Sequence, residues 1–303
     1  MTGNMVQQKQ QLFVVGLPGA GKTTYLAALW HVVESSEVQS ALRLVKLQGD
    51  ATYLNQVRSL WVDAKRLERT KLSEQANLHM LLESADDSSC ELWIPDLSGE
   101  AFEVQWTDRV ASKEYCSYVR DSEGGLLFVH PHVREEHLIT DINALVPQLP
   151  DEQDEEATTK VPDSADGVAV AWDARLAPTQ VQLVDLLQFV MALRSGRAVR
   201  LSVVVSAWDL VKDQSTPEQW VKDKLSLLHQ FLSTQGPKVQ AKYFGISAQG
   251  GDIEDPTAVD ALRKRTKPSD RIQVYDGAER IHDITAPIKW VIQGNGDADE
   301  GAT

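Results

Sequence analysis

The sequence predicts an α/β fold in which a mainly parallel sheet carries helices on both faces. Short apolar runs alternate with amphipathic stretches along most of the chain, which is typical of strand–helix–strand units. Several runs, such as the one at 199–210, are apolar almost throughout, as strands buried on both faces are. A glycine-rich turn follows the first apolar run and leads into a helical pattern. Together these observations favour one layered domain with a glycine turn at a strand end.

The first half of the chain predicts five strands and three helices. The strands are short apolar runs bounded by polar or turn-forming residues, and they cover residues 11–15, 42–47, 78–82, 91–95 and 124–131. The helices have apolar residues three or four positions apart, and they cover residues 22–34, 52–69 and 100–121. We expect the second helix to belong to an insertion of about residues 49–69.

The second half predicts two more strands and three more helices. The strands cover residues 199–210 and 241–251, and the helices cover residues 178–194, 217–232 and 286–293. Thr216 and Pro217 favour a helix start at this point. A threonine side chain can cap exposed N–H groups, and proline fits the first helical turn. The strand at 241–251 is the last clear strand in the sequence pattern.

The chain is expected to form a single domain with two tails. Residues 133–176 are acidic and rich in turn formers, so we expect a surface loop insertion there. The domain is expected to span residues 11–293, between an N-terminal tail at 1–10 and a disordered tail at 294–303.

Composition excludes several classes of protein. The formal net charge of −14 argues against a general nucleic-acid binder, which needs a cationic face. The polar N-terminus lacks the apolar segment of a signal peptide, and no apolar run is long enough to span a bilayer. We therefore expect a cytoplasmic protein with no transmembrane segment.

The cysteines and clustered histidines do not indicate a disulfide framework or a metal site. Cys90 and Cys116 are the two cysteines, and they offer no paired motif. His130, His132 and His137 lie close together but lack the spacing and further partner that zinc requires. We interpret these histidines as part of a loop that follows the strand at 124–129 and lies near the nucleotide.

The glycine-rich turn reads GLPGAGKT and matches the phosphate-loop (Walker A) pattern G-x-x-x-x-G-K-[ST]. Its glycines allow consecutive backbone N–H groups to point at phosphate oxygens, and the positive end of the following helix adds attraction. We expect Lys22 to neutralise the β- and γ-phosphates and the Thr23 hydroxyl to bind Mg²⁺. The predicted phosphate-binding residues are Gly16, Leu17, Pro18, Gly19, Ala20, Gly21, Lys22, Thr23 and Thr24.

Three further strands end in residues suited to a nucleotide, and ligands of open α/β sheets lie at such carboxyl ends. Asp96 is expected to hold Mg²⁺ through a water, and Gly99 can offer its N–H to a γ-phosphate. Asp209 can accept two hydrogen bonds from guanine N1 and N2, which adenine cannot supply. Ser247 and Ala248 can present a backbone N–H to guanine O6.

These motifs, in this order, resemble those of GTPases of the translation-factor-related (TRAFAC) class. The matching segments cover residues 16–23, 96–99, 206–209 and 247–249. More narrowly, the stretches GLPGAGKTTYLAALWHVV, RT at 69–70, PTQVQLVDLLQ and SAWD are similar to the bacterial double-GTPase families. The resemblance implies a three-layer P-loop NTPase fold with GTP or GDP and Mg²⁺ as ligands. It also implies a place in multi-gene bacterial conflict (antiviral defence) systems, beside a second GTPase or an effector of the same operon.

The chain departs from the class pattern at both base-reading elements. The usual Asn-Lys-x-Asp element reads Ser206, Ala207, Trp208 and Asp209, so the lysine stem that packs on the base is missing. Trp208 does not replace it directly, because its position should point elsewhere. The third residue of the last element is Gln249 in place of lysine. Because the aspartate remains, we still expect guanine to be preferred over adenine.

The resemblance also implies residues that respond to the γ-phosphate. A threonine that contacts Mg²⁺ and the γ-phosphate is expected at Thr70, with Thr52 as the runner-up, although Thr52 opens a helix and fits a cap. Arg69 or Arg66 would then stabilise transition-state charge, unless both are exposed helix residues. Glu100 stands where many relatives place a water-orienting glutamine. It is a candidate base, or else a charge that favours a helix N-terminus.

We therefore expect a Mg²⁺-dependent GTP-hydrolysing switch with a low intrinsic rate. Loss of the γ-phosphate is expected to release residues 66–76 and 97–110 and so to change a partner surface. Two other interpretations stay open. One is a nucleotide-binding assembly module that hydrolyses little, and the other is an ATP-using P-loop enzyme such as a kinase.

Overall fold

The computed structural model describes residues 10–67, 78–86, 88–94, 99–134, 174–212 and 215–293. Within these ranges one sheet runs in the order β2-β3-β4-β1-β5-β6-β7-β8-β9. Its strands are β1 (Gln10–Gly16), β2 (Leu42–Gln48), β3 (Leu78–Ser84), β4 (Ser89–Ile94), β5 (Gly124–Val129), β6 (Val199–Ser206), β7 (Val239–Ser247), β8 (Gln273–Asp276) and β9 (Glu279–Ile281). The five strands from β4 to β7 pair in parallel, and antiparallel pairs extend the sheet on both sides.

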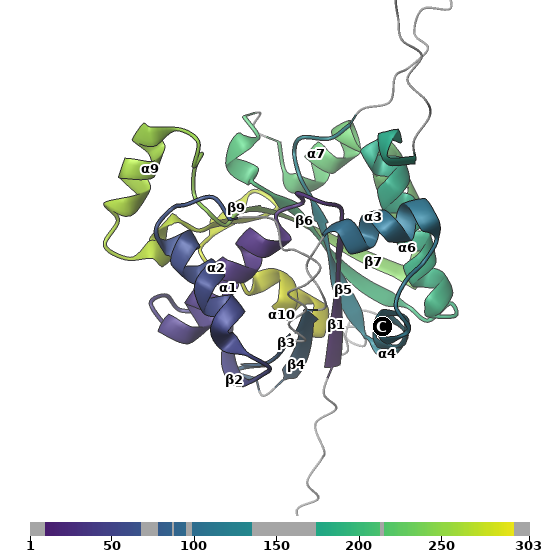
Figure 1. Cartoon of the computed structure of the whole chain (residues 1–303). Helices are drawn as coiled ribbons and strands as arrows, with labels where there is room; N and C mark the ends of the chain where they lie inside the picture. Colours follow the sequence, from purple (N-terminus) through teal and green to yellow (C-terminus); the bar gives the residue numbers. More distant parts are fainter. Residues whose placement is uncertain are drawn as a thin grey trace, which may run out of the picture.

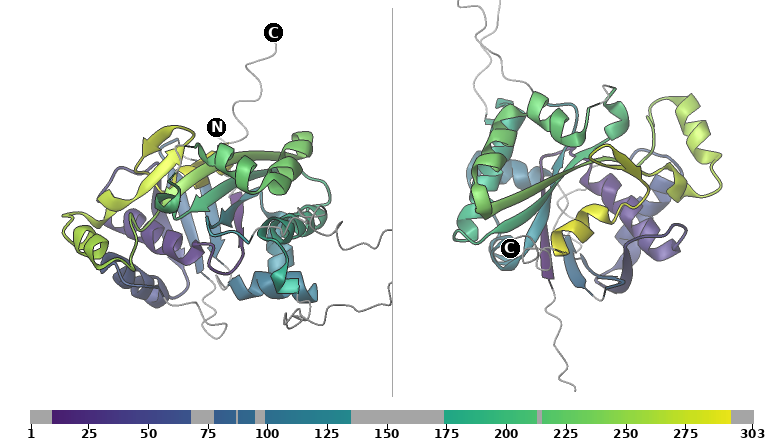
Figure 2. Two further views of the ribbon diagram at one scale, coloured as in Figure 1. Left: turned by 90° about the horizontal axis from the view of Figure 1, so that it is seen from above. Right: turned by 180° about the vertical axis from the view of Figure 1, so that it is seen from behind.

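Helices cover both faces of this sheet (Figure 1, Figure 2). One face carries α1 (Lys22–Ser35), α2 (Ala51–Val62) and α10 (Ala286–Ile292). The other face carries α3 (Gly99–Asp108), α4 (Lys113–Asp121), α6 (Thr179–Leu193), α7 (Pro217–Lys224) and α8 (Ser226–Thr234). The expected α/β class with three layers is thus confirmed. Within the described residues, no helix combines the length and apolarity that crossing a membrane requires.

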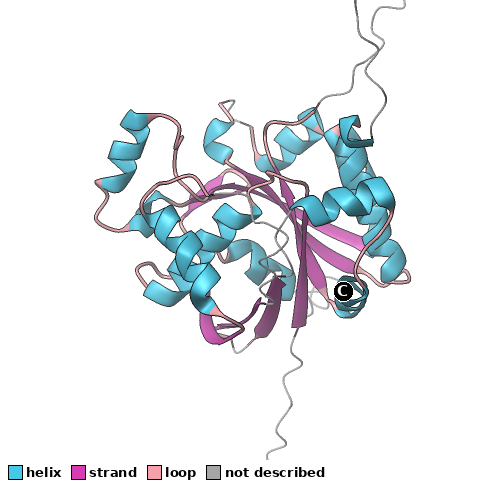
Figure 3. Ribbon diagram, viewed as in Figure 1, coloured by secondary structure: helices cyan, strands magenta, loops and turns pink. Residues whose placement is uncertain are grey.

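Alternation along the strands builds a separate core on each face. In β1, Leu12 and Val14 pack in the core with α1, while Phe13 and Val15 pack in the core with α6. All four side chains are at least 95% buried, because helices lie above and below the strand. Figure 3 shows the strands enclosed between the two helical layers. The sheet is therefore a rigid support for the loops at its strand ends.

Two predicted helices are each broken into two. The helix expected at 217–232 stops at Lys224, because the fully buried Leu225 leaves helical geometry with φ −135°. Its predicted cap is confirmed, since the Thr216 hydroxyl accepts a hydrogen bond from the Gln219 N–H. The helix expected at 100–121 breaks at Arg109, which takes a left-handed φ of 60°. Tertiary packing overrides local helical periodicity at Leu225, whereas the second half of the other helix starts at a local cap, where the Ser112 side chain accepts from the Tyr115 N–H.

Two short strands that the sequence does not show clearly follow β7. The hairpin of β8 and β9 follows it, and the unpredicted helix α9 (Pro256–Arg263) precedes this hairpin. The helix expected at 52–69 ends at Val62, and Ala64 takes a left-handed φ of 50° two residues later. The acidic insertion expected at 133–176 lies almost entirely outside the described residues.

Candidate functional site

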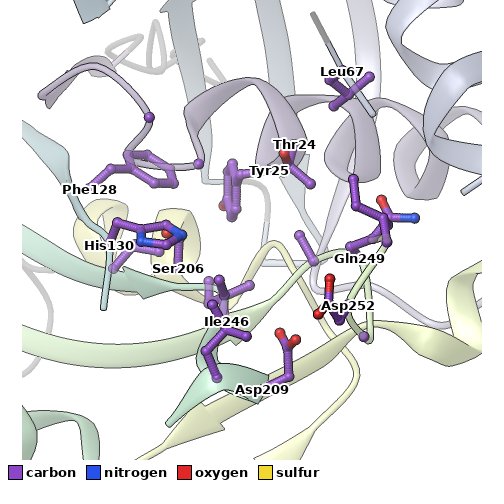
Figure 4. A pocket seen from close by; sticks show the side chains of 18 of the residues that line it. Thr24, Tyr25, Leu67, Phe128, His130, Ser206, Asp209, Ile246, Gln249 and Asp252 are labelled. Atoms are coloured by element: carbon purple, nitrogen blue, oxygen red, sulfur yellow. The ribbon is translucent and has the colours of Figure 1, made fainter. Parts of the chain in front are cut away.

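Parallel pairing brings the carboxyl ends of β1, β5, β6 and β7 to one edge of the sheet. The registers place Gly16 beside Phe128, and Ser206 beside Ile246. A cavity of about 240 Å³ opens at this edge, close to the lower end of usual ligand pockets at roughly 300 Å³. Figure 4 shows its lining side chains. The sheet edge thus carries the cavity that the strand-end motifs predict.

The phosphate loop is already folded around the lysine side chain. Gly21 takes φ +84°, which favours glycine, and α1 begins at the next residue. The Lys22 side chain is 4% exposed, and its Nζ donates to the carbonyl oxygens of Gly16 at 2.6 Å and Leu17 at 2.9 Å. The ammonium also lies 5.3 Å from the ring centroid of Phe102 in α3. The cation is therefore held inside the loop by the loop's own backbone.

Asp209 lies at the cavity in a fixed local setting. It follows Ala207, which takes a left-handed φ of 44°, and it sits in the short 3₁₀ turn at Trp208–Leu210. The Asp209 carboxylate is exposed, lines the cavity and accepts a hydrogen bond from the Ser247 hydroxyl. The Ser247 oxygen accepts in turn from the Gly250 N–H at 3.1 Å. Two neighbouring strand ends thus cooperate to orient one carboxylate.

Trp208 turns away from the cavity. Its indole is 6% exposed and packs against the α-carbon of Gly245, where an added Cβ would lie 2.4 Å from the ring. Its ring centroid lies 6.5 Å from that of Trp220 in α7. Ser206, two residues earlier, instead lines the cavity, and its hydroxyl donates to the Val129 carbonyl at 3.2 Å. The tryptophan is a core residue that anchors the turn carrying the aspartate.

Half of the predicted nucleotide-binding residues line the cavity. The predicted residues that line the cavity are Gly19, Gly21, Thr24, Ser206, Ala207, Asp209, Ala248 and Gln249. The predicted residues that lie outside the lining are Gly16, Leu17, Pro18, Ala20, Lys22, Thr23, Trp208 and Ser247.

Most of the residues that we predict to act on the γ-phosphate lie in parts of the chain that the structure does not describe. Arg69, Thr70 and Asp96 lie outside the described residues, and Gly99 and Glu100 are described only as the first two residues of α3.

The two alternative γ-phosphate residues have other partners. Thr52 does not cap its helix, because Asp50 is the N-cap and accepts from both the N–H and the hydroxyl of Thr52. Arg66 is exposed, and its guanidinium lies 3.5 Å from the Glu254 carboxylate.

The cavity lining also includes residues outside the sequence motifs, among them Lys65, Leu67, His130 and Asp252. His130 directly follows β5, so its place at a strand end was the signal that could have found it. Its Nδ1 accepts from the His132 N–H at 3.1 Å, and burial lowers the pKa of the ring below 6.5. The Lys65 ammonium lies 2.8 Å from the Asp63 carboxylate.

The end of α2 is fastened to the loop after β7. The Trp61 indole N–H donates to the Ala248 carbonyl at 3.0 Å. The fully buried Arg271 stacks 4.1 Å from the Trp61 ring centroid and donates to the carbonyls of Trp61 and Val62. This clasp positions the next residues, Lys65 and Leu67, at the cavity.

Comparison with known families gives one finding. A family model described as Double-GTPase 1 matches residues 13–291, from β1 into α10. The comparison with curated proteins gives no match. The matched range includes all the residues that line the cavity.

Proposed function

Because the chain belongs to the Double-GTPase 1 family and is thus a P-loop GTPase of the double-GTPase type, we propose that its cavity binds Mg²⁺-GTP and that it hydrolyses the β–γ phosphoanhydride. Water attacks the γ-phosphate in line, and the protein contributes positioning and charge neutralisation. GDP then remains in the same cavity.

The orientation of Asp209 is the observation that carries the choice of guanine. Its carboxylate lies at the cavity and is held by Ser247. A carboxylate accepts hydrogen bonds and donates none, so it matches the N1–H and N2–H donors of guanine. Adenine has no such pair of donors. A bound adenine would therefore cover the carboxylate without hydrogen-bonding to it, and this loss disfavours adenine.

The phosphate side of the site uses the loop and α1. The loop amides and Lys22 would surround the phosphates, at the positive end of α1. Thr23 is half-buried in the first turn of this helix, and within the described residues no group of three His, Cys, Asp or Glu side chains is arranged to hold a metal. This fits Mg²⁺, which takes few protein ligands beside waters and phosphate oxygens. With Thr23, the proposed ligands are Asp96 and Thr70, and the ion would neutralise phosphate charge.

The remaining roles follow the class resemblance. We assign γ-phosphate sensing to Gly99 and Thr70, orientation of the attacking water to Glu100, and transition-state charge stabilisation to Arg69. We further propose, from the resemblance to the bacterial double-GTPase families alone, that the partner is a second GTPase or an effector of the same operon in a bacterial defence system. Recovery of such a protein with the chain in its GTP-bound form, and not in its GDP-bound form, tests this assignment.

Nucleotide competition tests the proposed activity. GTP and GDP should displace a fluorescent guanine nucleotide from the purified protein in the presence of Mg²⁺, and ATP should not. Asp209→Asn should shift the preference toward xanthosine triphosphate, because xanthine offers a carbonyl where guanine offers the N2 amino group. Single-turnover hydrolysis, with Lys22→Ala as the inactive control, separates a GTPase from an assembly module. Equal competition by ATP would refute the assignment.

A further inference from the structure

His130 is a cavity residue for which the nucleotide motifs give no role. It follows β5 directly, between the phosphate loop on one side and the Ser206–Asp209 segment on the other. Figure 4 shows His130 and Ser206 on one side of the cavity and Gln249 on the opposite side. The ring is half-buried in the cavity wall. An imidazole therefore faces the space in which the base is proposed to bind.

The hydrogen bonding of the ring determines which nitrogen of His130 carries the proton. Nδ1 accepts from the backbone N–H of His132 at 3.1 Å, which assigns the proton of the neutral ring to Nε2. Burial lowers the pKa of His130, so the ring is neutral at pH 7. A neutral imidazole is a flat, weakly polar surface that can lie against a purine.

The surroundings leave room for such a contact. Ala207 contributes a methyl group to the cavity wall, at the position where the class pattern has a lysine stem. The charged residues that line the cavity together with His130 are Asp209, Asp252 and Lys65, whose ammonium pairs with Asp63. The exposed His132 ring lies beside the His130 ring at a tilted angle, with the centroids 5.0 Å apart.

We propose that His130 binds the guanine base with its ring face and takes the place of the missing lysine stem as one wall of the base site. The inference rests on the proposed function, since it requires a guanine nucleotide in this cavity. The base then lies against the imidazole, while Asp209 reads its N1–H and N2–H edge.

Titration with GDP tests this role. His130→Ala should raise the Kd for GDP by about 5- to 100-fold, the loss seen when an aromatic side chain stacked on a base is removed. His130→Phe should restore most of the affinity, because it keeps a flat ring, and His130→Gln should not. His132→Ala is the matched control: it removes the neighbouring ring but keeps the backbone N–H that holds His130, and because His132 does not line the cavity it should bind GDP like the wild type.

An NMR measurement on the wild-type protein tests the contact directly, without relying on the affinities of the variants. The sequence holds seven histidines, and comparison with His130→Phe assigns the His130 ring signals in a ¹H–¹³C spectrum. These signals should move on addition of GDP to the wild type, through the ring current of the base.

The proposal is overturned if the wild type binds GDP and these signals stay in place. It is also overturned if His130→Ala binds GDP normally, or if His130→Gln restores affinity where His130→Phe does not. Failure of the wild type to bind any guanine nucleotide would overturn the proposed function instead.

Discussion

Replacing Ser247 with alanine tests whether Asp209 is held in place for a base. The Ser247 side chain is 1% exposed, donates to the Asp209 carboxylate and accepts from the Gly250 N–H. Ser247→Ala removes both hydrogen bonds with little change of volume. The carboxylate then turns freely into solvent, and binding a base must first bring it back.

The magnitude follows from the exposure of the carboxylate. In the free protein Asp209 is exposed, so water screens its bond to Ser247, which is worth less than about 1 kcal/mol. Once a base covers the carboxylate, a hydrogen bond to a charged group is worth about 1.5–3 kcal/mol. The difference of about 1–2 kcal/mol corresponds to a rise of about 5- to 30-fold in the Kd for GDP.

Calorimetric titration with GDP and urea unfolding measure the two parts of this effect. Ser202→Ala is the matched control. Ser202 lies on β6 away from the cavity, is also fully buried, and donates to the Pro287 carbonyl at 2.8 Å. It should lower the free energy of unfolding by about 0.5–1.5 kcal/mol and leave the Kd unchanged. If Ser247→Ala binds GDP as tightly as Ser202→Ala does, then Ser247 does not orient the base-reading carboxylate.

Three other predictions concern stability and reactivity. Gly245→Ala places a Cβ 2.4 Å from the Trp208 ring, so it should lower the free energy of unfolding by about 1–3 kcal/mol and weaken GDP binding through the adjoining turn. Burial lowers the pKa of His31 from 6.5, so the unfolded chain takes up the proton first. The free energy of unfolding in urea should therefore fall as the pH drops below 6.5, with a smaller slope in His31→Gln. Burial raises the pKa of the Cys90 thiol to about 12, so a thiol reagent should modify the half-buried Cys116 quickly and Cys90 only after unfolding.

Local patterns predicted the sheet and the phosphate loop well. The strands β1, β5, β6 and β7 are buried on both faces, so their apolar runs were visible without knowledge of tertiary structure. The spacing from Gly16 to Thr23 is a local requirement of phosphate binding, and the structure places a helix start directly after Gly21. Such features are encoded within a few neighbouring residues.

Features that depend on distant partners were not visible in the sequence. The strands β8 and β9 are short and half-exposed, so they lack an apolar run, and their pairing depends on the edge that β7 offers. The break at Leu225 depends on a pocket in the second core that buries its side chain. His130 carries no motif, and only the position of β5 beside β6 brings it to the cavity.

The loop after β7 and the segment that follows α2 both line the cavity, and they are joined by contacts that no sequence motif describes. Trp61 at the end of α2 holds the carbonyl of Ala248, and Arg271 from beside β8 holds the end of α2. Because Arg271 is fully buried, these bonds have no competition from water and the clasp is stiff. The loop that carries Ala248 cannot shift without shifting the end of α2, and with it Lys65. Helix α2 is therefore a structural support of the cavity, and in the proposed base site a base that orders the loop after β7 would also order the end of α2.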